Sequence, residues 1–87
     1  MYVIMVYDVN VSRVTKVLKV GRKYLNWVQN SVLEGELTKS KMEKLKSELR
    51  RVINVKEDSV IFYVLRSTKY MTWEYLGKEK GREELII

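Results

Sequence analysis

The chain begins with the run MYVIMVYD, residues 1–8, in which seven apolar or aromatic residues lead without interruption into one carboxylate. A continuous run of β-prone apolar residues predicts a strand buried on both faces rather than a half-exposed alternating strand. Asp8 is therefore expected where a central strand leaves the core. A carboxylate there either accepts hydrogen bonds from the backbone of the following turn or binds a ligand.

Length and composition limit the class of protein. With 87 residues, of which 46% are hydrophobic, we expect a single folded domain over residues 1–87 rather than a disordered chain. No apolar stretch approaches the roughly 18 to 20 residues of a membrane span. The first apolar run also lacks the basic start and cleavage site of a signal peptide. These observations predict a cytoplasmic protein with no membrane partner.

The residue types that are missing exclude several chemistries. The chain has no cysteine and no histidine, which excludes disulfides, thiolate nucleophiles, cysteine-based metal sites and histidine-dependent ribonuclease chemistry. Any catalysis must use carboxylates, tyrosine, lysine or an oxygen-bound ion such as Mg²⁺. A net charge of +6 favours a polyanionic partner, most simply nucleic acid.

A basic amphipathic helix is predicted after a short turn over residues 9–12, with Ser12 as its N-cap. The apolar positions recur at helical spacing: Val14, Val17, Leu18, Gly21 and Leu25. The other faces carry five cations and no acid, namely Arg13, Lys16, Lys19, Arg22 and Lys23. Such a helix can follow a phosphate backbone without reading sequence, so these five residues are the candidate nucleic-acid contacts.

The remaining elements follow in a simple order. Residues 27–37 form either one long bulged strand or two short strands. A second helix over roughly 39–54 begins at Thr38 or at a Ser40–Glu43 capping box. Residues 59–65 predict another strand that is buried on both sides, residues 73–77 a short strand, and the apolar residues 84–87 close the chain.

This order predicts an α+β, ferredoxin-like βαββαβ sandwich with both helices on one face of the sheet and an extra C-terminal strand. The strands are apolar on both faces, so the second face needs a cover, and a second copy of the chain is the expected cover. The apolar end predicts that a strand over about residues 79–87 crosses to the partner's sheet edge.

Two motifs resemble the CRISPR-associated protein 2 family, the small adaptation proteins that work with the CRISPR integrase. The first motif is the strand end Val6-Tyr7-Asp8-Val9, which precedes the basic helix. The second, more specific motif is the Gln-x-Ser-Val-x-x-Gly pattern at residues 29–35. The family often has phenylalanine where this chain has Leu33, a difference that affects packing more than chemistry.

The resemblance implies a homodimer joined through its sheets, in which Asp8 of each copy faces its symmetry mate. It also implies a role in spacer acquisition, with the dimer bridging integrase molecules and supporting duplex DNA. Members of the family have been described as metal-dependent endonucleases acting on RNA or duplex DNA, so the expected partners are duplex DNA or single-stranded RNA.

Under this resemblance, Asp8 is the candidate catalytic residue and the candidate ligand of a Mg²⁺ ion shared by two copies. Two close carboxylates repel each other, so an ion or a shared proton is required between them. Asn10 and Ser31 are candidate polar groups supporting this site. Arg13 is expected either to hold a phosphate or to pair with Asp8.

Three functions are therefore considered. The first is an adaptation scaffold that binds duplex DNA and the integrase, and the second is a Mg²⁺-dependent nuclease using Asp8. The third is a ferredoxin-like ribonuclease toxin or regulatory dimer outside CRISPR biology. Three aromatic residues near Lys69 and Lys78 either stack on bases or pack the end of the core, and packing is favoured: Tyr70, Trp73 and Tyr75.

Overall fold

A computed structural model describes residues 1–79 of the chain. It contains five strands and two helices, in the order β1 (Tyr2–Asp8), α1 (Val11–Arg22), β2 (Asn26–Gln29), β3 (Val32–Glu36), α2 (Lys39–Val52), β4 (Ser59–Leu65) and β5 (Met71–Gly77). The strand predicted at 73–77 therefore starts earlier, at Met71. The strand predicted over about 79–87 lies outside the described residues. None of the helices formed by residues 1–79 is long and apolar enough to cross a membrane.

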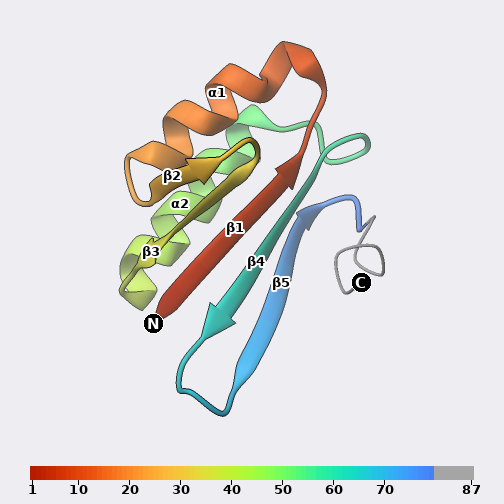
Figure 1. Ribbon diagram of the computed structural model, residues 1–87. Coiled ribbons are helices and arrows are strands. Elements are labelled where there is room, and N and C mark those ends of the chain that lie inside the picture. Colours follow the sequence, from red (N-terminus) through yellow and green to blue (C-terminus); the bar gives the residue numbers. More distant parts are fainter. Residues whose placement is uncertain (80–87) are drawn as a thin grey trace.

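The strands form one sheet in the order β2-β3-β1-β4-β5, and each pair of neighbours is antiparallel. The first four strands have the ferredoxin-like order, and β5 extends that sheet beyond β4 (Figure 1). The prediction of an α+β, ferredoxin-like fold is therefore confirmed. The central position of β1 explains the unbroken apolar run with which the chain begins.

The core lies between the sheet and the two helices, which pack side by side (Figure 1). Alternate residues of β1 enter this core, because successive side chains of a strand point to opposite faces. Val3, Met5 and Tyr7 are buried there, and β4 contributes Val60 and Phe62 from register positions opposite them. Val17 of α1 and two leucines of α2 complete the centre: Leu45 and Leu49.

The first helix begins earlier than predicted. Its N-cap is Asn10, whose side-chain oxygen accepts a hydrogen bond from the Ser12 backbone N–H, so the assignment of Ser12 as N-cap is wrong. Asn is among the strongest N-cap residues, because its short side chain reaches the free N–H groups of the first turn. The helix ends at Arg22, and Leu25 is buried just beyond it.

The second helix begins at Thr38, one of the two predicted starts, whose hydroxyl accepts a hydrogen bond from the Lys41 N–H. One lysine of α2 is buried. The ammonium group of Lys46 donates a hydrogen bond to Glu74 of β5. The aliphatic stem packs along the core while the charged end reaches a carboxylate on the neighbouring strand.

Residues 27–37 form two short strands, which decides between the two alternatives. The turn between them contains Asn30, whose φ of 39° lies in the left-handed region that Asn tolerates better than most residues. The register between β2 and β3 shifts between Trp27 and Gln29. Gly35 lies inside β3 opposite Val3.

The sheet face away from the helices, called the helix-free face below, is largely apolar. The strand register aligns three rows of side chains across it: Tyr2–Leu65–Met71, Ile4–Tyr63–Trp73 and Val6–Ile61–Tyr75. Tyr2, Ile4 and Val6 of β1 are only half-buried, and Met71 and Trp73 are exposed. In a single chain, β1 is therefore fully buried only on its helix side, because α1 and α2 cover that side only.

Candidate nucleic-acid and metal-binding site

Asp8 is the last residue of β1 and is exposed. It lies opposite Ser59 in the register and follows Val6 by two residues, so its side chain is on the helix-free face. The carboxylate predicted at the exit of the central strand thus stands at one end of the apolar rows. Its place on that face is the property that determines what it can bind.

Asp8 can supply one carboxylate to a hydrated ion. Within residues 1–79, no three acidic side chains come together to form a metal cluster. Glu34 and Glu36 lie opposite Ile4 and Tyr2, toward the other end of β1 from Asp8. Mg²⁺ is commonly bound by one or two carboxylates with waters completing its shell, so a single Asp8 per chain fits one half of such a site.

The two polar residues proposed to support Asp8 have contacts of their own near the end of β1. The Asn10 side chain caps α1. The Ser31 backbone oxygen accepts a hydrogen bond from the Tyr7 N–H at 3.1 Å. Burial raises the pKa of the Tyr7 hydroxyl above its usual value, and a hydrogen bond with Ser31 partly offsets that shift.

The guanidinium of Arg13 contacts two acidic residues at the end of the α2–β4 loop. Its Nε donates to Asp58 Oδ2 at 2.5 Å, and its terminal nitrogen donates to Asp58 Oδ1 at 3.0 Å and to Glu57 at 2.7 Å. This two-point contact with Asp58 is the strongest geometry available to an arginine and a carboxylate. Arg13 therefore belongs to a structural ion pair with Asp58 and Glu57.

Asp58 is the central residue of a network that sequence reasoning missed. It is 0% exposed, and its carboxylate also accepts hydrogen bonds from the backbone N–H groups of Asn10 and Asn54. The hydrogen bonds from Arg13 are the main reason that the pKa of Asp58 is lowered to about 2. The network ties the segment after Asp8 to the end of α2. The signal was available in the topology, because pairing β1 with β4 places residue 58 beside residue 9.

The backbone of Asp58 also fixes the chain beyond β5. Its carbonyl oxygen accepts a hydrogen bond from the Lys78 N–H at 2.7 Å. Gly77 makes this contact possible, because its φ is 76° and a Cβ atom there would lie 2.2 Å from that same oxygen. Only glycine fits a position that combines a left-handed backbone with so close an approach.

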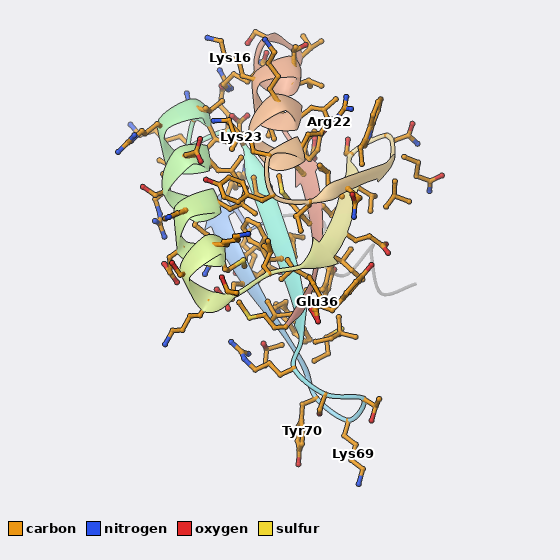
Figure 2. All side chains as sticks on the ribbon, turned by 90° about the vertical axis from the view of Figure 1, so that its left-hand side faces the viewer. Lys16, Arg22, Lys23, Glu36, Lys69 and Tyr70 are labelled. Carbon is orange, nitrogen blue, oxygen red and sulfur yellow. The ribbon has the colours of Figure 1, made fainter. Side chains whose placement is uncertain are left out.

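Four of the five predicted basic residues line the outward face of α1, and they differ in their contacts. Lys16, Lys19, Arg22 and Lys23 are all exposed. Lys23 is paired with Glu48 of α2 at 2.6 Å. Arg22 lies over the indole of Trp27, with its Cζ 5.8 Å from the ring centroid. Figure 2 shows Lys16 projecting outward from α1, away from the sheet.

The three aromatic residues near Lys69 and Lys78 do not lie together on one surface. Tyr70 is 71% exposed and projects with Lys69 from the turn between β4 and β5 (Figure 2). Trp73 and Tyr75 lie instead in the apolar rows of the helix-free face. The Tyr75 hydroxyl is buried and has no hydrogen-bond partner among the residues that the structure describes.

Known proteins resemble this chain over its full length. It is 60% identical to a CRISPR-associated endoribonuclease Cas2 of Dictyoglomus turgidum and 64% identical to one of Thermotoga maritima, each match covering 100% of both chains. A crystal structure of Cas2 matches with a TM-score of 0.74 and 44% identity, covering 92% of this chain and 90% of that one.

A second solved structure and a family model agree with these matches. Streptococcus pyogenes Cas2 at pH 6.5 matches with a TM-score of 0.69 and 37% identity, covering 75% of this chain and 86% of that one. The model of the family described as CRISPR associated protein Cas2 matches residues 1–72. These residues include Asp8, the basic stripe of α1 and the Asp58 network, and the chain therefore belongs to the CRISPR associated protein Cas2 family.

Proposed function

We propose that this protein acts in CRISPR adaptation as a homodimeric scaffold that binds nucleic acid and the CRISPR integrase. In the proposed dimer, the two Asp8 carboxylates form a Mg²⁺ site that supports phosphodiester hydrolysis. The relatives from Dictyoglomus turgidum and Thermotoga maritima are named endoribonucleases, which favours RNA as one substrate, beside duplex DNA. Family membership favours this role over that of a toxin or a regulatory dimer outside CRISPR biology.

The observation that carries the proposal is that Asp8 shares the helix-free face with the apolar rows. An apolar face of this extent on a small domain is typical of an interface. A second copy that covers the face by two-fold symmetry uses the same patch on both chains. If, as the resemblance to the family implies, the two-fold axis passes close to the end of β1, each Asp8 lies beside its symmetry mate and two carboxylates are available where one chain supplies only one.

A Mg²⁺ ion bound by that pair would neutralise charge on a phosphate and lower the pKa of a bound water. The protein's own contribution is to place two carboxylates at the strand ends and to carry a separate row of cations on α1. α1 begins only three residues after Asp8, and its outward stripe carries Lys16, Lys19 and Arg22. This stripe points away from the sheet, so it can bind phosphates along the outer surface of α1 without reading the base sequence.

Removal of the two lysines of the stripe tests the nucleic-acid part of the proposal. The double variant Lys16→Ala/Lys19→Ala is expected to weaken duplex DNA binding about tenfold or more at low salt, and to reduce the salt slope by about 2, because two phosphate contacts are lost. Fluorescence anisotropy at several salt concentrations measures both quantities. Lys56→Ala, an exposed lysine of the α2–β4 loop, is the matched control. An unchanged slope in the double variant would contradict the assignment.

Charged substitutions on the helix-free face test the dimer. Light scattering is expected to give the mass of a dimer for the natural protein at micromolar concentration. Ile4→Glu and Trp73→Glu place a charge in the same apolar row and are expected to give monomers. Val55→Glu is the control, because Val55 is an exposed apolar residue outside that face. A monomeric natural protein, or dimers in both face variants with unchanged circular dichroism, would refute the proposed interface.

A further inference from the structure

We propose that the indole of Trp27, which lies in contact with the Arg22 guanidinium, is a stacking site for an unpaired nucleobase. In this proposal, the phosphates next to that base follow Lys16 and Lys19 along α1. The inference rests on the proposed nucleic-acid role of the α1 stripe and adds to it a preference for single-stranded ends or strands. The ligand is thus a base with a free ring face, in RNA or DNA.

The position of Trp27 in the sheet places it next to α1. It belongs to β2, the edge strand, and its register partner is Leu33, which is buried on the helix side of the sheet. Partners in register point to the same face, so the indole lies on the side of α1. Figure 2 shows Arg22 on the part of α1 nearest β2. Trp27 is nevertheless 50% exposed, unusually open for so large an apolar ring.

Two contacts hold the ring in one orientation. Its Nε1 donates a hydrogen bond to the Asn30 carbonyl oxygen at 3.0 Å. The Arg22 guanidinium lies over the ring, within the range of a cation–π contact. The left-handed backbone at Asn30 sets the direction of the carbonyl group that accepts the bond. A ring ordered before binding loses little conformational freedom when a ligand stacks on it, which favours binding.

The charges around the ring suit a nucleic-acid strand. Lys16, Lys19 and Arg22 succeed one another at spacings of three residues, so they span about 9 Å of the helix axis and end at the indole. The nearest carboxylates along the neighbouring elements are engaged elsewhere. Glu48 is paired with Lys23, and Glu34 accepts a hydrogen bond from Tyr2 on the helix-free face.

An aromatic ring at the end of a basic track distinguishes single strands from duplexes. Bases inside a duplex are already stacked on each other, whereas an unpaired base offers a free π-face to an exposed aromatic side chain. Positively charged tracks with such rings are the general means of binding single strands without sequence preference. The basic stripe alone would bind both forms through phosphates, so the indole adds the discrimination.

The chain offers a direct reporter for this contact, since it contains only two tryptophans. In the background Trp73→Phe, Trp27 is the sole source of indole fluorescence. Titration with oligo-dT or oligo-U is expected to quench this fluorescence, and an abasic strand of the same length is expected to leave it nearly unchanged. Affinity for the base-bearing strands is expected to exceed that for the abasic strand about tenfold. Comparison of the affinities for oligo-dT and oligo-U shows whether the strand bound is DNA or RNA.

Variants at position 27 complete the test. Trp27→Ala is expected to abolish the preference for base-bearing over abasic strands and to leave duplex binding within about twofold, while Trp27→Phe restores most of the preference. Val28→Ala, at an equally exposed neighbour in β2, is the matched control. Equal quenching by abasic strands, or an equal loss of duplex and single-strand binding in Trp27→Ala, would overturn the inference. Failure of the lysine variants described above would instead refute the proposed function itself.

Discussion

Asp58→Ala is expected to lower the free energy of unfolding by about 3–5 kcal/mol, the usual cost of removing one partner from a buried ion pair. The variant leaves the Arg13 guanidinium without its bidentate partner and two backbone N–H groups, those of Asn10 and Asn54, without an acceptor. Urea unfolding followed by circular dichroism measures the change. A loss of this size is a large fraction of the stability of a small domain.

Glu57→Ala is the matched control, because Glu57 contacts the same guanidinium from a side chain that is 55% exposed. Surface ion pairs contribute little, so this variant is expected to lose less than about 1 kcal/mol. Equal losses in the two variants would contradict the view that Asp58 is the centre of the network. A small loss in Asp58→Ala alone would show that solvent replaces its hydrogen bonds.

The same network makes a prediction about pH. The folded-state pKa of Asp58 is lowered to about 2, chiefly by the hydrogen bonds from Arg13, below its ordinary value of 3.8. A lowered pKa means that the carboxylate stabilises the fold fully above about pH 4, and that this contribution is lost as the pH falls toward 2. Asp58→Asn is therefore expected to be less stable at neutral pH and to change less between pH 4 and 2.

The sequence was sufficient to predict the fold because the periodicity of its apolar residues is strong. The two continuous runs form the central strands β1 and β4, and apolar residues at helical spacing, Met42, Leu45 and Leu49, form the buried face of α2. Periodicity says less about the residue at which a helix begins or ends, because single hydrogen bonds determine that position. The start of α1 was misplaced because both Asn10 and Ser12 are good caps, and only the backbone geometry selects between them.

The contacts of the charged residues were harder to predict, because they depend on which strands become neighbours. Arg13 and Asp58 are 45 residues apart in the chain and meet only through the pairing of β1 with β4. Trp27 and Arg22 are close in sequence, yet their stacking depends on the turn at Asn30. Lys46 could not be distinguished from the exposed lysines of α2 until β5 placed Glu74 beside it.

The second large effect is expected at Asp8. If two Asp8 carboxylates hold Mg²⁺ across the proposed dimer, Asp8→Ala is expected to lower the rate of RNA or duplex DNA cleavage at least about 100-fold. Duplex binding without added metal is expected to change less than about threefold, since the basic stripe of α1 is intact. Asp8→Asn is expected to behave like Asp8→Ala in cleavage, because the amide keeps the shape but loses the charge that holds a divalent cation.

The chelator EDTA separates this site from an unrelated source of activity. Treatment of the natural protein is expected to reduce cleavage to the level of Asp8→Ala, and treatment of the variant is expected to cause no further loss. Cleavage that survives both the substitution and the chelator would refute the proposed site. Spacer acquisition by Asp8→Ala gives an independent measure: because the scaffold role depends on the dimer and on the cations of α1, acquisition is expected to persist after cleavage is lost.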